Sequence, residues 1–253
     1  MNVAVIMKQV PDTEALIKVA PDGSGYVKEG VKFVMNPYDE FGVEEALKNK
    51  ESAGASSVTI ISMGPERTVE AIRTGLAMGA DKGVLLKIGD DEYTDAMGVA
   101  TALADELKAG DFKLIYCGKQ AIDDDMAQVG PMVAQLLDIP CISVVTEVEL
   151  SGDKAVCTRE IEGGKEVFDV TLPAVIACQK GLNEPRYASL PGIMKAKKKP
   201  LDIKDASLAA AKSEIVKWEM PPERPAGRIL EGDDPAAKAA ELVKALREEA
   251  KVI

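Results

Sequence analysis

The chain has 253 residues, which is long enough for one large α/β domain or two small ones. Acidic residues outnumber basic ones by 42 to 31, and the net charge of −11 argues against a nucleic acid as the main partner. The sequence contains no histidine, which excludes Ser-His-Asp and Cys-His catalysis. A catalyst built from this chain would therefore need a cofactor to carry its chemistry.

The cysteine pattern and the first residues bear on where the protein works. The four cysteines are widely scattered without CxxC spacing, at Cys117, Cys141, Cys157 and Cys178. This pattern favours reduced thiols in a cytoplasmic location and predicts no metal site. The sequence starts directly with the strand-like segment NVAVIM, so we expect no signal peptide. No apolar run approaches the ~20 residues of a membrane span.

Short apolar segments alternate with helical patterns through the first half of the chain. The apolar segments predict buried strands at residues 3–7, 57–62, 84–86 and 114–117. Amphipathic patterns predict helices that begin near Pro37, Val69, Thr94 and Met126. Strands and helices that alternate with short loops predict a parallel sheet with helices on both faces.

The second half has a different pattern. Period-two segments joined by tight turns predict antiparallel strands at 142–150, 154–161 and 167–172, before a buried strand returns to the sheet at 173–178. Little regular pattern follows Pro200 until a short amphipathic helix at 236–251. We therefore expect an α/β fold with three layers. A parallel-sheet domain over residues 1–200 would carry an antiparallel strand insertion, and an extended C-terminal arm would cover residues 201–253.

The stretch 114–131 joins a predicted buried strand to a polar loop and then to a helix. Open parallel sheets bind ligands at such junctions, and free amides at the helix start could cradle a phosphate. Asp123, Asp124 and Asp125 would repel that phosphate if they pointed at it, and one of them could simply cap the helix. Both interpretations stay open on this stretch alone. Neither GxGxxG after the first strand nor GxxxxGK[ST] is present, so ordinary dinucleotide and P-loop sites lack support.

Several segments together resemble one family, the small (beta) subunit of electron-transfer flavoproteins. The most specific matches are Arg159–Gly164, Leu172–Val175 and Leu182–Lys199, the last of which reads LNEPRYASLPGIMKAKKK. Further matches are Lys8–Thr13, Met35–Pro37, Ala77–Asp81 and Gly118–Asp125. The resemblance covers nearly the whole chain and is weakest over residues 204–235.

The resemblance implies an adenine-nucleotide hydrolase-like domain that works in a heterodimer. The large (alpha) subunit would hold an FAD and receive the C-terminal arm, while this chain would hold an adenine nucleotide at the carboxyl edge of its own sheet. No catalytic or metal-binding residue is implied. Carried over residue by residue, the nucleotide contacts are Ile6, Asn36, Pro37, Tyr38, Asp39, Met63, Gly118, Lys119, Gln120, Ala121, Ile122, Asp123, Asp125, Met126, Ala127, Gln128 and Val129.

The nucleotide itself stays open between AMP and a second FAD. AMP-holding members typically carry an Asn and a Thr around a Gln in this loop, where this chain has Ala127-Gln128-Val129-Gly130-Pro131. That variant, together with Lys8–Thr13, resembles the electron-bifurcating or nitrogen-fixation-associated branch, whose beta subunit holds a second FAD. Gly118–Asp125 and Tyr187–Lys199 instead resemble the AMP-type branch. The loop variant tips the balance slightly towards FAD.

The family's recognition loop falls on residues 187–199. Leu190 would insert into an apolar pocket of an acyl-CoA dehydrogenase partner, and Lys195 and Lys198 would tune the docking by charge. From the residues alone, a Leu beside a Pro is also a common loop anchor, and a lysine run is commonly just solvated. The residues assigned to docking are Tyr187, Ala188, Ser189, Leu190, Pro191, Ile193, Met194, Lys195 and Lys198.

The function implied is that of a non-enzymatic electron carrier, which takes electrons from flavin dehydrogenases and passes them to a downstream acceptor. The alternative within the family is a bifurcating subunit, with NADH oxidised at a second FAD held in this chain. A different class is an adenine-nucleotide-binding regulatory module without redox work, since α/β folds with such sites serve many functions. A hydrolase or ligase acting on an adenylate lacks an evident nucleophile or base.

Overall fold

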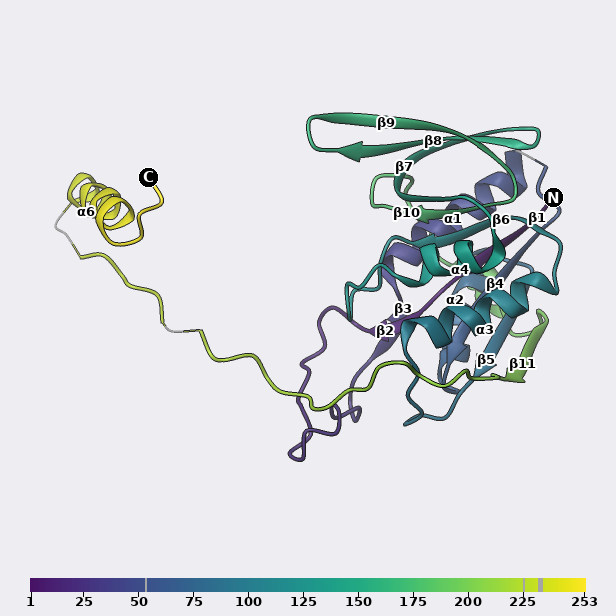
Figure 1. Cartoon of the computed structure of the whole chain (residues 1–253), viewed down its shortest axis with the longest axis horizontal. Coiled ribbons are helices and arrows are strands. Elements are labelled where there is room, and N and C mark those ends of the chain that lie inside the picture. The colour runs from purple at the N-terminus through teal and green to yellow at the C-terminus, as the bar shows by residue number, and fades with distance from the viewer. Residues whose placement is uncertain (53, 225, 232–233) are drawn as a thin grey trace.

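The computed structural model describes residues 1–52, 54–224, 226–231 and 234–253, and within them the chain forms a nine-stranded sheet flanked by helices (Figure 1). The strands run in the order β11-β5-β4-β1-β6-β10-β7-β8-β9. Neighbours from β11 to β7 pair in parallel, whereas β7, β8 and β9 pair antiparallel. The predicted α/β class and the antiparallel insertion are thus confirmed.

The sheet strands are β1 (Asn2–Ile6), β4 (Ser57–Gly64), β5 (Lys82–Lys87), β6 (Phe112–Gly118), β7 (Cys141–Ser151), β8 (Lys154–Ile161), β9 (Gly164–Thr171), β10 (Ala174–Cys178) and β11 (Leu201–Asp205). The helices are α1 (Pro37–Ser52), α2 (Thr68–Met78), α3 (Ala96–Lys108), α4 (Val129–Leu137), α5 (Leu190–Ala196) and α6 (Pro235–Glu248). A separate antiparallel pair consists of β2 (Gln9–Pro11) and β3 (Phe33–Met35).

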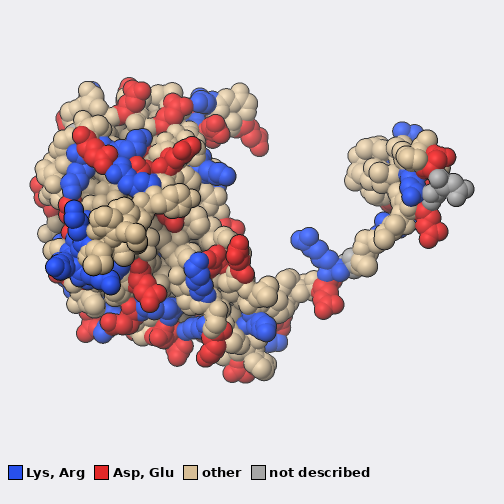
Figure 2. Space-filling model, turned by 180° about the vertical axis from the view of Figure 1, so that it is seen from behind, with Lys and Arg blue, Asp and Glu red and all other residues tan. Residues whose placement is uncertain are grey.

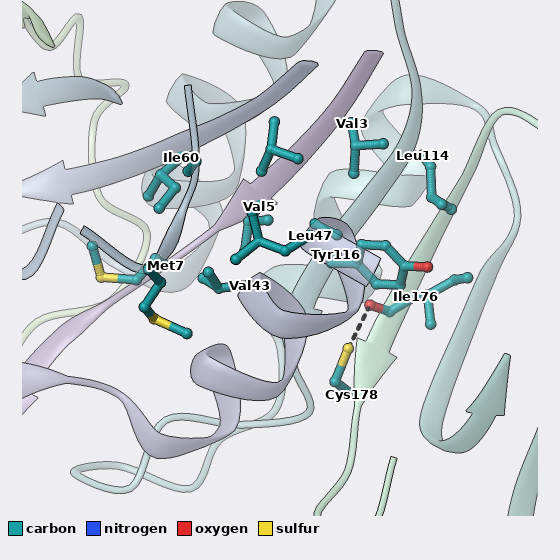
Figure 3. Packing of buried hydrophobic residues seen from close by; sticks show 14 of the residues in the cluster. Val3, Val5, Met7, Val43, Leu47, Ile60, Leu114, Tyr116, Ile176 and Cys178 are labelled. Atoms are coloured by element: carbon teal, nitrogen blue, oxygen red, sulfur yellow. Dashed lines mark hydrogen bonds between the residues drawn. The ribbon is translucent and has the colours of Figure 1, made fainter. Parts of the chain in front are cut away.

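Alternate residues of each buried strand face opposite layers of helices, because side chains along a strand point to opposite faces. In β1, Val3 and Val5 pack with α1 and α2, whereas Ala4 and Ile6 pack with α3 and α4. Figure 3 shows the first layer, where Val5 and Tyr116 meet Leu47 of α1. This double cover explains why the central strands are apolar throughout rather than alternating.

Tyr116 at the centre of this core is fully buried, and its hydroxyl donates a 2.7 Å hydrogen bond to Oδ1 of Asn49. A buried tyrosine needs such a partner, since an unpaired hydroxyl in an apolar core costs free energy. Because Asn49 belongs to α1, the bond also fixes this helix against β6. The two elements that meet here, α1 and β6, are the ones that build the site described below.

The sheet extends beyond the boundary predicted at residue 200. Leu201–Asp205 pairs with β5 as an edge strand, so the irregular arm begins only after Asp205. Along the first part of the arm, the N–H of Lys212 donates to Asp95 and the ring of Trp218 lies 5.9 Å from that of Tyr26. The arm then leaves the sheet domain and ends in α6, none of whose residues is buried (Figure 1). Among the described residues, no helix has the length and apolarity needed to cross a membrane.

Candidate functional site

A crevice opens at the carboxyl ends of β1, β4 and β6. The chain runs from β1 outward through β4 and β5, then returns to place β6 on the other side of β1. The gap between β1 and β6 is therefore a topological switch point, where open α/β sheets bind ligands. It leads into a cavity of about 820 Å³, within the range of small-molecule sites.

Most of the residues assigned to nucleotide contact meet in this cavity. Those that line it are Ile6, Asn36, Asp39, Met63, Gly118, Lys119, Gln120, Ala121, Asp123, Met126, Ala127, Gln128 and Val129. Pro37, Tyr38, Ile122 and Asp125 are outside the lining. Tyr38 instead packs its ring 5.0 Å from the ammonium of Lys119, and Asp125 accepts a 2.5 Å hydrogen bond from the side chain of Gln120.

Asn36 fixes the polar loop that follows β6. Its side chain is buried, with its Nδ2 donating to the carbonyl of Gln120 at 2.9 Å and its Oδ1 accepting from the N–H of Ile122 at 3.2 Å. Both halves of the amide are thus used on the backbone of the loop. Asn36 therefore shapes the cavity wall from beneath.

Asp39, one turn into α1, joins the ends of two strands. Its carboxylate accepts from the N–H of Gly118 at 2.7 Å and from the N–H of Lys8 at 2.8 Å. Burial raises the pKa of this carboxyl to about 7, although both hydrogen bonds favour the ionised form. The ends of β1 and β6 are thereby held at the separation that forms the crevice.

Lys8 reduces the negative charge that the loop aspartates would present to a phosphate at this place. Its ammonium lies 2.8 Å from Asp123 and 2.9 Å from Asp124. Partial burial disfavours the ammonium, but these two carboxylates outweigh that effect and raise the pKa of Lys8. Asp124 also accepts from the N–H of Met126 at 3.1 Å. Two of the three carboxylates are therefore paired with one ammonium, which offsets one unit of negative charge and which the sequence pattern did not single out.

The start of α4 offers backbone donors to the cavity. Gln128, at the N-cap, makes no side-chain capping bond, and within the described part of the chain no acceptor faces the N–H groups of Gln128, Val129 and Gly130. The loop reaches this point through Ala127, whose φ of 53° is left-handed and costly for alanine. Unpaired amides at the positive end of a nine-residue helix favour an anion.

The cavity continues past the predicted contacts to a second region. Its wall there includes Gln9, Arg67, Thr68, Tyr93 and Thr94. The Arg67 guanidinium stacks 4.3 Å from the Phe33 ring and pairs with Asp90. These residues come from β2, β3, the start of α2 and the segment before α3, which share no motif, so only the fold reveals their proximity.

The thiol and acidic side chains near the crevice bear on the chemistry that it can support. The thiol nearest to it, Cys117, has a pKa raised by burial, which keeps it protonated and poorly nucleophilic. Among the described residues, no cluster of acidic or cysteine side chains could hold a metal ion.

A second feature lies on the surface at Tyr187–Lys199, which we call the docking loop. Its apolar side chains are exposed, to 98% at Tyr187, 80% at Leu190 and 67% at Met194. Residues 190–196 form α5, which begins with a hydrogen bond from the N–H of Gly192 to the Ser189 hydroxyl. Pattern reasoning missed this helix, although Ser189 and Pro191 are typical start signals. Figure 2 shows Lys and Arg gathered on the side of the sheet domain opposite the arm.

Comparison with known proteins identifies the family of this chain. The sequence model of the electron transfer flavoprotein domain matches residues 24–209. The chain is similar to the electron transfer flavoprotein subunit beta of Bacillus subtilis, with 43% identity and full coverage of both chains. It is 41% identical to the subunit beta of Syntrophomonas wolfei, over 100% of this chain and 98% of that one. The human subunit beta is 42% identical over 96% of this chain and 98% of its own. The chain therefore belongs to the electron transfer flavoprotein family, as a beta subunit.

Proposed function

We propose that this chain forms a heterodimer with a large subunit that holds FAD. The heterodimer would carry electrons from acyl-CoA dehydrogenase type flavoenzymes to a downstream acceptor. The docking loop carries this proposal, because a helix that holds Leu190 and Met194 in water beside several lysines is expected of an interaction surface. The flavin supplies the redox chemistry, and this chain supplies binding and docking. Its four free cysteines favour the cytoplasm.

Replacing Leu190 by alanine should weaken reduction of the heterodimer by an acyl-CoA dehydrogenase. Truncating an important interface side chain typically costs 1 kcal/mol or more, so we expect KM for the heterodimer to rise about fivefold or more. Stopped-flow or steady-state reduction of the bound flavin measures this. Ile203, which is 45% exposed on β11, offers a matched control in Ile203→Ala. Unchanged kinetics in Leu190→Ala, with nucleotide still bound, would contradict the docking role.

We propose further that the crevice holds the adenosine and first phosphate of a nucleotide. Three observations support it: the unpaired amides from Gln128 to Gly130, the ion pairing of Asp123 and Asp124 with Lys8, and the apolar wall provided by Ile6 and Met63. AMP and the adenylate half of FAD present the same groups here. In this first region only the loop variant at residues 127–131 leans towards FAD.

The second region of the cavity favours a second FAD, and with it the bifurcating alternative. The volume of about 820 Å³ lies in the upper half of the usual range for ligand sites. Around this region, Gln9 Oε1, Arg67 Nε, Thr68 Oγ1 and Thr94 Oγ1 are buried without a hydrogen-bond partner among the described residues. Buried polar groups normally have hydrogen-bond partners. The polar middle of a dinucleotide would supply partners to these four atoms once their side chains turn towards the cavity.

The decisive experiment is the flavin and AMP content of the purified heterodimer, measured after denaturing release and chromatography. Two FAD and no AMP would make this chain the holder of a redox centre. One FAD and one AMP would make it a nucleotide-bound docking platform, and the second cavity region would then belong to the interface with the large subunit. A heterodimer without a flavin spectrum would favour the regulatory module instead.

The arm supplies the proposed contact with the large subunit. Ile229 is 90% exposed, and Leu242 and Val243 of α6 are exposed to 47% and 43%. The apolar side chains of α6 are not buried against the rest of this chain, so another surface is needed to bury them. We therefore assign residues 206–253 to the large-subunit interface.

A further inference from the structure

The docking loop is tied down at its start by Arg186. The Arg186 guanidinium donates to both oxygens of Glu44, at 2.8 and 2.9 Å, and to both oxygens of Glu51, at 2.6 and 3.1 Å. Its backbone N–H also reaches Glu44, at 3.1 Å. The two carboxylates raise the pKa of Arg186 further above its ordinary value. Planar double pairing of this kind fixes orientation as well as distance.

The partners of Arg186 are part of the rigid body of the protein. Glu44 is 6% exposed and belongs to α1, the helix that Asn49 joins to the core through Tyr116. Just before the loop, Asn183 donates to the carbonyl of Phe41 and to Glu45, at 3.0 Å in both cases. The chain is therefore immobilised on α1 immediately before the exposed residues begin.

The end of the loop is tied to α2 in an equivalent way. Arg73 donates to the carbonyls of Ala196 and Lys199, at 2.5 and 2.9 Å. Lys199 in turn donates to the carbonyls of Leu76 and Ala80, at 2.9 and 2.6 Å. Between the two ends, Gly192 lies so close to α2 that a Cβ there would be 2.5 Å from the carbonyl oxygen of Ala77.

Between these attachments, few side chains of the loop are buried. Tyr187, Leu190 and Met194 point into solvent, and of residues 187–199 only Ala196 is buried. A loop with so small a core would sample many shapes if its ends were free. Each side chain that has to be ordered on docking reduces affinity, whereas a loop already fixed in shape avoids this cost.

We propose that Arg186 and Arg73 are positioning residues, which hold the docking loop between α1 and α2 in the shape that the dehydrogenase recognises. This inference rests on the proposed docking role of the loop. Both guanidinium groups are engaged within this chain, Arg186 with the carboxylates of α1 and Arg73 with the carbonyls at the end of the loop. They act on electron transfer through Leu190 and its neighbours.

Arg186→Lys and Arg73→Lys test this in the intact heterodimer. Both variants keep the positive charge, so they leave electrostatic steering in place and remove only the geometry of the guanidinium. We expect KM for the heterodimer with an acyl-CoA dehydrogenase to rise about tenfold while kcat stays within about twofold. Amide hydrogen exchange over residues 187–199 should accelerate by a similar factor, with the rest of the sheet domain unchanged.

Arg159→Lys is the matched control, because Arg159 pairs with Glu166 through Nε and Nη2 at 2.7 Å, on β8 and β9, remote from the loop in the fold. Glu51→Gln is a third test variant, which loosens only the exposed half of the Arg186 attachment and so is less prone to a folding defect.

Unchanged hydrogen exchange over the loop in Arg186→Lys, Arg73→Lys and Glu51→Gln would overturn the inference. So would faster exchange with an unchanged KM, provided that Leu190→Ala raises KM. If Leu190→Ala also leaves KM unchanged, the docking role itself fails, and the inference with it.

Discussion

The Gly118→Ala variant is expected to lose the nucleotide that we propose for the crevice and to be less stable by about 1–3 kcal/mol. A Cβ at this position would lie 2.6 Å from Asp39 Oδ1, 2.6 Å from the Cβ of Tyr38 and 2.8 Å from its carbonyl carbon. None of these atoms can retreat easily, since two belong to the first turn of α1 and the third is part of a carboxylate whose two oxygens each accept from one backbone N–H group. The end of β6 would have to move, and the polar loop with it.

Urea denaturation of the isolated chain and the nucleotide content of the heterodimer measure the two effects. Gly164 provides the control, because a Cβ there meets no atom within 4 Å. Gly164→Ala should change stability by no more than about 0.5 kcal/mol and leave the nucleotide in place. A Gly118→Ala variant that retains both stability and nucleotide would mean that β6 and α1 can separate, and that the crevice is less rigid than its hydrogen bonds indicate.

The sheet domain was predictable because its strands and helices have strong and separate patterns. Segments such as 57–62 are apolar and β-branched, and the helices between them carry one apolar stripe each. The edge strand β11 was not predicted, since an edge strand is covered on few sides and LDIKD alternates without a strong apolar character. Its pairing with β5 depends on a neighbour more than a hundred residues earlier in the chain. Local pattern does not contain that information.

The residues of the candidate site likewise fall into those that the sequence predicted and those that only the fold revealed. Strand ends and helix starts placed Ile6, Asn36 and Met63 at one edge of the sheet, because parallel topology requires it. The partner of Asp123 could not be read from the sequence, since Lys8 lies 115 positions away and neutralises it only in the folded chain. Arg67 and Thr94 likewise reach the cavity through loops without a motif. The family resemblance implied contacts for a nucleotide only in the first region of the cavity. The second region could be recognised only from the folded structure.

Asp39 is expected to make the free energy of unfolding of this protein decrease as the pH rises from about 4 to about 7. Its carboxyl has a native pKa of about 7 against an ordinary 3.8, because burial disfavours the charge. In this window the native state holds a proton that the unfolded chain has released, so stability decreases as pH rises. One pKa unit corresponds to about 1.4 kcal/mol, which sets the full effect at no more than about 4 kcal/mol. Below pH 4 and above pH 7 this group contributes no slope.

The contribution of Asp39 is isolated by comparing the wild type with Asp39→Asn in urea denaturation from pH 4 to pH 8. The asparagine can accept only one of the two N–H bonds well, so the variant carries a constant loss that does not depend on pH. The stability advantage of the wild type over the variant should therefore shrink steadily with rising pH. Asp153→Asn, at an exposed turn between β7 and β8, controls for the loss of one negative charge. An advantage that grows with pH would mean that the two N–H donors outweigh burial, and that Asp39 holds β1 and β6 together as a carboxylate at every pH in this range.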